Sequence, residues 1–439
     1  MLMGALWLGC SSDTSPLLEE SEASVEASRV EGSTLVLITV ESWRMDHLPF
    51  VGYGRDTMPQ LEARLARGRV FTHAIAPASW TLPSMASIVT GLLPSEHGLR
   101  TPDRSLGPQA RTTAEVLADR GYQTIFLGSN PWLVDGTGIE QGFELWDARA
   151  GSSGDRLVQD LKDRLADREP AAPLFLHLHF FEPHCKYRPP RRQQGLFEPV
   201  DSRMTSGVLL TEEQYESMGD CYRLQTESGE PELDLDTYIS RYDAELRATD
   251  GLIEASIELI DTALGLEDTL VILAGDHGES FWEHGDFGHG RQLFQESVRV
   301  PLVLLGGLAG SPERVEAPVS LIDIHPTLLL SAGVEVSSDR DLRVPPLGSP
   351  VFSETEQDGV DLRGAWIEDR GVIWDRRQDS WKGYDLGTDP REQSPGYADL
   401  LLKRAIRSRF AGASGPGLSE DSSRGTEQDD VLHSLGYRD

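Results

Sequence analysis

Short apolar runs alternate along this chain with segments of helical periodicity. The runs are rich in Val, Leu and Ile and lack apolar–polar alternation, which is typical of strands buried on both faces. They occupy Thr34–Val40, Thr124–Leu127, Leu174–Phe180, Thr269–Ala274 and Val300–Leu305. Apolar residues at helical spacing predict helices over Met58–Arg67, Thr113–Arg120, Arg156–Asp167 and Leu235–Leu264. The alternation predicts an α/β sandwich around a mostly parallel sheet, with the active site at the carboxyl ends of the strands.

The rest of the chain divides by composition. Residues 1–32 contain a short apolar start and a Ser/Glu-rich stretch, interpreted as a signal and polar tether, and 33–335 form the main α/β domain. Within it, the segment 185–234 lacks periodicity and is interpreted as an insertion or lid. Residues 336–410 are predicted to form a small C-terminal subdomain, strand-rich over Arg363–Leu386, followed by a loose acidic tail at 411–439.

The overall charge limits the class of partner. The chain has 439 residues, with 40 Lys and Arg against 72 Asp and Glu, for a net charge of −32. Phosphate-backbone binding needs a clustered basic face, so nucleic acid is excluded as a partner. Locally the balance reverses, because Lys186, Arg188, Arg191 and Arg192 stand close to the single acid Glu182. A small anionic ester therefore remains a compatible substrate.

The N-terminus and the cysteines bear on the compartment. The start MLMGALWLGCSS resembles the end of a bacterial lipoprotein signal, in which Cys10 would carry a lipid anchor, and this predicts the cell envelope, either periplasmic or lipid-anchored. The alternative is an N-terminal segment with an inert cysteine. In an oxidising compartment Cys185 and Cys221 could pair, whereas otherwise they would remain free thiols.

Polar residues follow two of the predicted strands. Glu41 comes directly after Thr34–Val40, and Asp276-His277 follows Thr269–Ala274 closely. Between them in sequence, Pro83 suits the first turn of a helix, which places Thr81 at or just before the helix N-terminus, where free N–H groups favour an anion. Because strand ends meet at one edge of a parallel sheet, these side chains are expected to share one site.

These segments resemble the sulfatases and their relatives in the alkaline phosphatase superfamily. The resemblance rests on LITVESWRMDHL, on TLPSMASIVTG, on FLHLHFFEPH and on AGDHGESFWEHGDFGHG, which occur in the family's order. It covers roughly 33–335 and implies an alkaline-phosphatase-like α/β/α sandwich acting on sulfuric or phosphoric esters.

The nucleophile position departs from the sulfatase pattern. Sulfatases carry Cys or Ser in C/S-x-P-x-R, and that residue is oxidised to formylglycine, whereas this chain has Thr81-Leu82-Pro83-Ser84-Met85. Threonine cannot give formylglycine, and Met85 replaces the stabilising arginine. The resemblance therefore implies that Thr81 acts directly as a metal-activated nucleophile, as in lipoteichoic acid synthases and phosphoethanolamine transferases.

The implied metal site also follows those relatives. They use a glutamate where sulfatases carry paired aspartates, so the implied ligands are Glu41, Thr81, Asp276 and His277. An imidazole among the ligands favours one Zn²⁺ or Mn²⁺ over Ca²⁺.

Further residues are assigned to the substrate by resemblance. His184 matches a substrate-contacting histidine, and His289 falls where sulfatases place a lysine on the anion, with His284 in the same loop. Asn130 is a neutral donor where sulfatases have a Lys-x-His pair, and Lys186 stands beside His184. His177 and His179 lie inside a strand and are interpreted as structural.

The predicted function is a metal-dependent hydrolase or transferase acting on phosphate or sulfate esters of a glycan, lipid headgroup or small molecule. One alternative is a sulfatase that works without formylglycine. Another is a catalytically inactive relative that binds a glycan or lipid headgroup.

Overall fold

A large sheet forms the centre of the molecule. The computed structural model describes residues 32–168, 172–197, 207–338, 340–345, 348–412 and 417–421. The nine-stranded sheet has the order β11-β2-β10-β7-β1-β6-β4-β5, with β12 beside β2. Its strands are β1 Thr34–Val40, β2 Arg69–Ile75, β4 Gln123–Gly128, β5 Leu145–Ala148, β6 Leu174–Phe180, β7 Thr269–Gly275, β10 Arg299–Leu305, β11 Glu313–Val315 and β12 Val319–Ser320. Only β10 runs antiparallel to its neighbours in this part of the structure, which confirms the predicted mostly parallel sheet.

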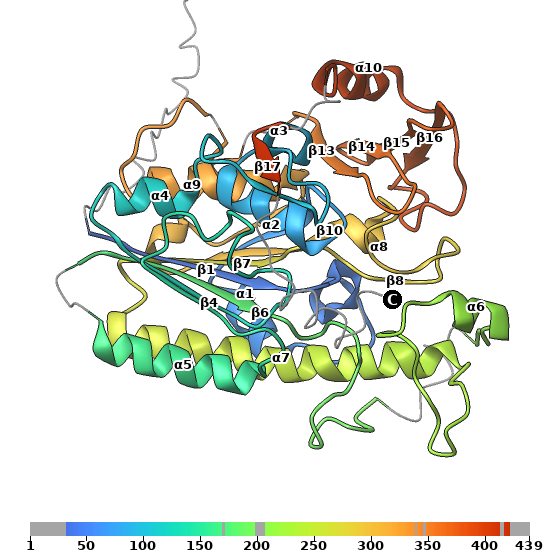
Figure 1. Ribbon diagram of the computed structural model, residues 1–439, viewed down its shortest axis with the longest axis horizontal. Helices are drawn as coiled ribbons and strands as arrows, with labels where there is room; N and C mark the ends of the chain where they lie inside the picture. Colours follow the sequence, from blue (N-terminus) through green and yellow to red (C-terminus); the bar gives the residue numbers. More distant parts are fainter. Residues whose placement is uncertain are drawn as a thin grey trace, which may run out of the picture.

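Helices cover both faces of this sheet (Figure 1). α5 and α7 lie along one face, and α2, α4 and α9 lie along the other. The helices are α1 Pro59–Leu65, α2 Thr81–Thr90, α3 Pro94–His97, α4 Thr113–Ala118, α5 Gly154–Asp167, α6 Glu212–Ser217, α7 Leu235–Leu264, α8 Gln295–Val298, α9 Ile324–Ser331 and α10 Leu400–Arg409. In β1, Leu35 packs in the same cluster as Leu82 of α2, whereas Val36 packs with Leu246 of α7. Odd- and even-numbered residues of these strands face opposite sides of the sheet and are both buried. For this reason the strands show no alternation of apolar and polar residues in sequence.

The insertion at 185–234 is tied to the main domain. Cys185 and Cys221 form a disulfide with their Cα atoms 5.5 Å apart, which answers the question that the sequence left open. The bond joins the residues just after β6 to the segment that follows α6. The insertion is therefore anchored at the carboxyl end of the sheet.

A second, antiparallel sheet lies beside the first. Its order is β13-β14-β15-β16, with bounds Val351–Thr355, Leu362–Ile367, Arg370–Asp375 and Ser380–Asp385. α10 packs on it through Leu402 and Ile406, which contact the cluster containing Val372. Two short pairs complete the structure, β3 (Arg104–Leu106) with β17 (Ser419–Asp421) and β8 (Ser280–Phe281) with β9 (Phe287–Gly288). Residues 419–421 thus form a strand inside the segment predicted as a loose tail.

The second sheet docks on the main domain through a buried carboxylate. Glu392, which follows β16, is 1% exposed, and its Oε2 accepts a hydrogen bond of 2.7 Å from the backbone N–H of Gln295 in α8. Burial raises the pKa of Glu392 to about 8, and the nearby Glu296 carboxylate adds to the effect.

This shift predicts a pH-dependent stability. Because the folded pKa lies above the ordinary value, Glu392 contributes a penalty that grows as the pH rises from about 4.5 to about 8. Glu392→Gln is therefore expected to raise the melting temperature at pH 9 and to leave it nearly unchanged at pH 5. The gain in the free energy of unfolding at pH 9 has an upper bound of about 5 kcal/mol. Calorimetry at both pH values checks this, and an equal shift at the two pH values would contradict it.

The described residues contain no helix with the length and apolar character needed to cross a membrane. The predicted signal and the lipid anchor on Cys10 fall on residues 1–31, outside the described residues.

Candidate active site

Glu41 occupies the carboxyl end of β1, in the middle of the sheet. Val40 pairs with Phe180 of β6 and with Gly275 of β7, so the three strands end side by side. The chain then turns sharply, since Ser42 has a φ of +50°, an uncommon conformation for a non-glycine residue that is often found at functional sites. Glu41 is fully buried and points its carboxylate into the junction of these ends.

Thr81 is the first residue of α2 and faces Glu41. Its Oγ1 donates a hydrogen bond of 2.6 Å to Oε1 of Glu41 and lies 3.4 Å from Nε2 of His277. α2 is held against the end of β7 because Ser84 Oγ donates to the carbonyl of Asp276 at 2.6 Å. The structure therefore brings the predicted nucleophile to the predicted ligands at the N-terminus of a helix.

Asp276 and His277 follow β7 and complete the cluster. Oδ1 of Asp276 accepts hydrogen bonds from the backbone N–H groups of Ser42 (3.1 Å) and His277 (2.8 Å), whereas its buried Oδ2 has no hydrogen-bond partner among the described residues. His277 donates from Nδ1 to the carbonyl of Gly278 at 2.8 Å. Its Nε2 is thereby directed to Oε1 of Glu41 at 3.0 Å and lies 3.6 Å from Oδ2 of Asp276.

The second oxygen of Glu41 has its own donors. Asn130 donates to Oε2 from Nδ2, and Nε2 of His179 lies 3.2 Å from the same oxygen. His179 is held from its other side, because its Nδ1 lies 2.8 Å from Oγ1 of Thr39. The sequence placed Asn130 near the site, but it left out His179, which lies one residue before the end of β6.

The electrostatics of the cluster favour a positive charge. Burial alone would raise the pKa of Glu41, but hydrogen bonds with His179 and His277 hold it well below its ordinary value. Burial raises the pKa of Asp276 well above its ordinary value, and the charge of Glu41 raises it further. Burial lowers the pKa of His277, yet the two carboxylates outweigh it and bring that pKa to about 9. A cation bound between these two buried carboxylates would offset their mutual repulsion.

The donors fit a divalent metal. Potential ligand atoms lie within 4.8 Å of one another in two groups, Glu41 with His277 and His289, and Glu41 with His179 and Asp276. The unpartnered Oδ2 of Asp276 lies 3.6 Å from Nε2 of His277 and would gain a ligand bond from a metal bound here. Carboxylate and hydroxyl oxygens together with imidazole nitrogens are groups that bind divalent metals in proteins.

Two further histidines, His184 and His289, lie next to the cluster formed by Glu41, Thr81, Asp276 and His277. The ring centroid of His289 lies 4.4 Å from that of His277 and 5.1 Å from that of His184. Burial lowers the pKa of His184 to about 4, so its imidazole is neutral at pH 7. The structure thus brings two of the three predicted substrate histidines, His184 and His289, to the cluster.

The other two predicted substrate residues lie elsewhere. His284 stacks on Phe294 with ring centroids 3.6 Å apart, and its nitrogens contact Glu296 at 2.7 Å and the carbonyl of Glu392 at 3.1 Å. It therefore joins the active-site loop to the second sheet instead of facing the cluster. Lys186 is exposed on the insertion.

The motif position at which sulfatases carry arginine is occupied here by a buried apolar residue, Met85. Met85 is 0% exposed and packs in the core cluster that also holds Leu82 and Phe126. No guanidinium can reach Thr81 from this position.

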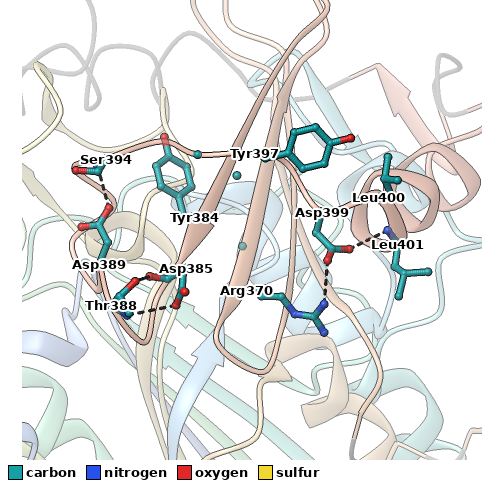
Figure 2. Close-up of a pocket in the computed structure, with 13 residues that line it drawn as sticks. Arg370, Tyr384, Asp385, Thr388, Asp389, Ser394, Tyr397, Asp399, Leu400 and Leu401 are labelled. Carbon is teal, nitrogen blue, oxygen red and sulfur yellow. Dashed lines mark hydrogen bonds and ion pairs between the residues drawn. The ribbon is translucent and has the colours of Figure 1, made fainter.

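A separate cleft lies on the second sheet (Figure 2). It has a volume of about 760 Å³ and is lined by residues of β15, β16 and α10 and of the loop between β16 and α10. Several of its polar groups bond to one another, for example Arg370 to Asp399 at 2.8 Å. None of its lining residues belongs to the Glu41 cluster, so it is not the site of the chemistry.

Comparison with known proteins identifies the family. The sulfatase family model matches residues 33–334. The chain belongs to the sulfatase family. As a member it is a sulfatase-like hydrolase of ester bonds, which confirms the predicted family and enzyme class. Sulfatases typically use a metal, and the Glu41 cluster provides candidate ligands.

Relatives of this sulfatase-family chain include two proteins of Formosa agariphila. A sulfatase is 23% identical over 393 residues, which is 76% of this chain and 74% of the relative. An ulvan-active sulfatase is 25% identical over 338 residues, 69% of this chain and 62% of the relative, so the chain spans less than two thirds of that protein's length.

Solved structures with the same fold extend to other esters. A protein in complex with its substrate D-glucosamine-2-N,6-O-disulfate has a TM-score of 0.71 and 18% identity, covering 92% of this chain and 96% of that one. The phosphonate monoester hydrolase of Agrobacterium radiobacter has a TM-score of 0.67 and 18% identity with the same coverage of each chain. At these identities the likeness establishes the fold alone.

Proposed function

We propose that this chain is a metal-dependent hydrolase of phosphate or sulfate esters in which Thr81 is the nucleophile. The observation that carries the proposal is the 2.6 Å hydrogen bond from Thr81 Oγ1 to Glu41 at the N-terminus of α2, inside a cluster of metal-ligating groups. Formylglycine chemistry has no precursor here, because threonine cannot form the aldehyde.

The residues have distinct roles in this proposal. We assign Glu41, Asp276, His277 and Thr81 to the metal. Glu41 forms one close group of potential ligand atoms with His179 and Asp276 and a second with His277 and His289. When bound, the metal lowers the pKa of the threonine hydroxyl and neutralises charge on the ester oxygens. Glu41 orients Thr81 through their hydrogen bond and accepts its proton.

Chemistry at the ester then proceeds in two displacements. Thr81 Oγ1 forms a bond to phosphorus or sulfur as the bond to the leaving oxygen breaks, and the alcohol leaves with a proton supplied by His289. The N-terminal end of α2 stabilises the oxyanion charge. Water then attacks the threonyl ester and gives one proton back to His289, and the inorganic anion is released as Glu41 returns its proton to Thr81.

A glycan ester is the substrate class best supported. One structural neighbour binds a disulfated glucosamine, and one relative is active on ulvan. On this chain, Lys186, Arg188, Arg191 and Arg192 are exposed on the insertion that follows β6 and would attract an anionic ester. The disulfide between Cys185 and Cys221 supports an oxidising compartment, in line with the proposed cell-envelope location.

Metal removal tests the proposal. After dialysis against a chelator, hydrolysis of p-nitrophenyl phosphate, bis-p-nitrophenyl phosphate or p-nitrophenyl sulfate is expected to fall by at least about 100-fold. Zn²⁺ or Mn²⁺ should restore it better than Ca²⁺, and Asp276→Asn protein should not respond.

The same assay separates the alternatives. Hydrolysis of the sulfate ester alone would favour a sulfatase that works without formylglycine. Absence of both hydrolysis and metal binding would favour an inactive binding protein, and activity that survives chelation would contradict the metal-dependent mechanism.

A further inference from the structure

A buried carboxylate beside the cluster has no role in the chemistry described above. Glu279 is fully buried, and its Oε1 accepts a hydrogen bond of 3.0 Å from Nδ1 of His289. Oε2 accepts one of 2.9 Å from the hydroxyl of Tyr187. Since a carboxylate only accepts, Nδ1 of His289 carries its proton, and Nε2 is left as the nitrogen available to substrate.

A tyrosine of the insertion joins the same group. The hydroxyl of Tyr222 lies 3.0 Å from Nδ1 of His289 and donates to Oε1 of Glu279 at 3.4 Å. The ring packs so closely that a Cβ on Gly288, whose φ is +88°, would lie 2.8 Å from it. The glycine before His289 is therefore needed for the tyrosine to reach the histidine.

The disulfide fixes this contact. Cys221 precedes Tyr222 directly, and its partner Cys185 directly follows His184, the other histidine above the cluster. Tyr187 stands two residues after Cys185. One covalent bond thus holds in place the insertion residues that contact Glu279 and His289.

We infer that Tyr222 and Glu279 are positioning residues for His289, and that the Cys185–Cys221 disulfide holds Tyr222 in that role. The inference rests on the proposed function, in which His289 contacts the ester. It assigns the insertion a part in catalysis, because without the Tyr222 contact the hydrogen bond to Glu279 holds His289 less firmly in its orientation toward the reacting group. Mutation of partners that orient a side chain at a metal site typically lowers activity by about 10- to 100-fold.

Conservative variants provide the first test. Tyr222→Phe is expected to lower kcat/KM by about 10-fold or more, mainly through kcat, while the melting temperature stays close to that of the wild type. Tyr238→Phe is the matched control, since Tyr238 is also buried but its hydroxyl bonds to backbone at Glu232 (3.0 Å) and Leu224 (3.3 Å). Its activity should remain within about threefold of the wild type, and equal losses in both variants would overturn the inference.

A double-mutant cycle tests whether Tyr222 acts through His289. In a His289→Ala background, Tyr222→Phe should reduce the remaining activity no further. An equal loss in the two backgrounds would show that Tyr222 supports the fold alone. The disulfide is tested in the same way, because Cys185→Ser/Cys221→Ser should lose about as much kcat as Tyr222→Phe, with no additional loss when the variants are combined. Full activity of the double serine variant would overturn the role of the disulfide.

Binding of inorganic phosphate separates this inference from the nucleophile assignment. In zinc-loaded Thr81→Ala protein, which should not turn over, adding Tyr222→Phe is expected to weaken phosphate about 10-fold by calorimetry. If Thr81→Ala retained turnover while Tyr222→Phe still weakened phosphate, the nucleophile assignment would fail and the positioning role would stand. Unchanged phosphate affinity would remove the positioning role.

Discussion

Thr81→Ala is expected to reduce ester hydrolysis by about 10⁴-fold or more, because it removes the atom that forms the covalent intermediate. The side chain is 1% exposed and donates only the 2.6 Å hydrogen bond to Glu41, so its loss should cost the fold little. Glu41 keeps its contacts with Asn130, His179 and His277 in the variant. Steady-state kinetics on the ester panel, with melting temperature as the readout of folding, provide the measurement.

Thr81→Ser is the matched control for this experiment. Serine retains the hydroxyl but loses the γ-methyl group that restricts the side-chain rotamer, so partial activity is expected. Thr81→Ala with activity within about tenfold of the wild type would exclude Thr81 as the nucleophile, since a missing nucleophile costs far more. Thr81→Cys would add a further check, because it places the residue type used by sulfatases in a motif that still has Met85.

Much of the fold could be predicted because the central strands are buried on both faces. β1, β6, β7 and β10 appear as continuous apolar runs, and each predicted range agrees with the structure to within one residue at either end. β2 and β5 were not predicted. β2 includes Arg69, Thr72 and His73 in its sequence, and every residue of β5 is only partly buried at the edge of the sheet. Neither strand has the apolar run that marks β1, β6, β7 and β10.

The core of the site could also be predicted, because it depends on strand ends. Glu41 and Asp276-His277 follow adjacent parallel strands, so their convergence follows from topology. His179 was missed because it lies within a strand and not after it. Its position opposite Thr39 makes it a neighbour of Glu41, and that register is not visible in a single sequence.

Contacts made by tertiary docking could not be predicted at all. Tyr222 lies in a segment without periodicity and contacts His289 directly beside the Cys185–Cys221 disulfide. His284 stands in the same loop as His289, but the docking of the second sheet places Glu392 against it. From their spacing in the sequence, His284 and His289 are equally good candidates for contacting the substrate. Only the packing of the folded chain distinguishes them.

The two carboxylates of the cluster are expected to respond in opposite ways when each is replaced by its amide. Glu41→Gln places an NH₂ group among the donors Thr81, Asn130 and His277, where two acceptor oxygens are needed. The metal-free variant should therefore lose about 3–5 kcal/mol of stability, as in other buried pairs that lose one partner. Asp276→Asn keeps the oxygen that accepts from Ser42 and His277, and it changes only the oxygen that has no hydrogen-bond partner.

Asp276→Asn should consequently leave the metal-free protein as stable as the wild type or more stable by about 1 kcal/mol, because it removes a buried charge that burial and Glu41 disfavour. Both variants should nevertheless lower the affinity for Zn²⁺ by more than about 100-fold. Replacing residues that only hydrogen-bond to metal ligands already lowers metal affinity by about 10- to 100-fold. Thermal melts in chelator, combined with zinc calorimetry, measure the two effects separately. If Asp276→Asn lost as much metal-free stability as Glu41→Gln, Asp276 would serve to stabilise the fold. A gain of stability in Asp276→Asn beside a loss in Glu41→Gln would instead mean that the charge of Asp276 is retained for the metal at a cost in stability.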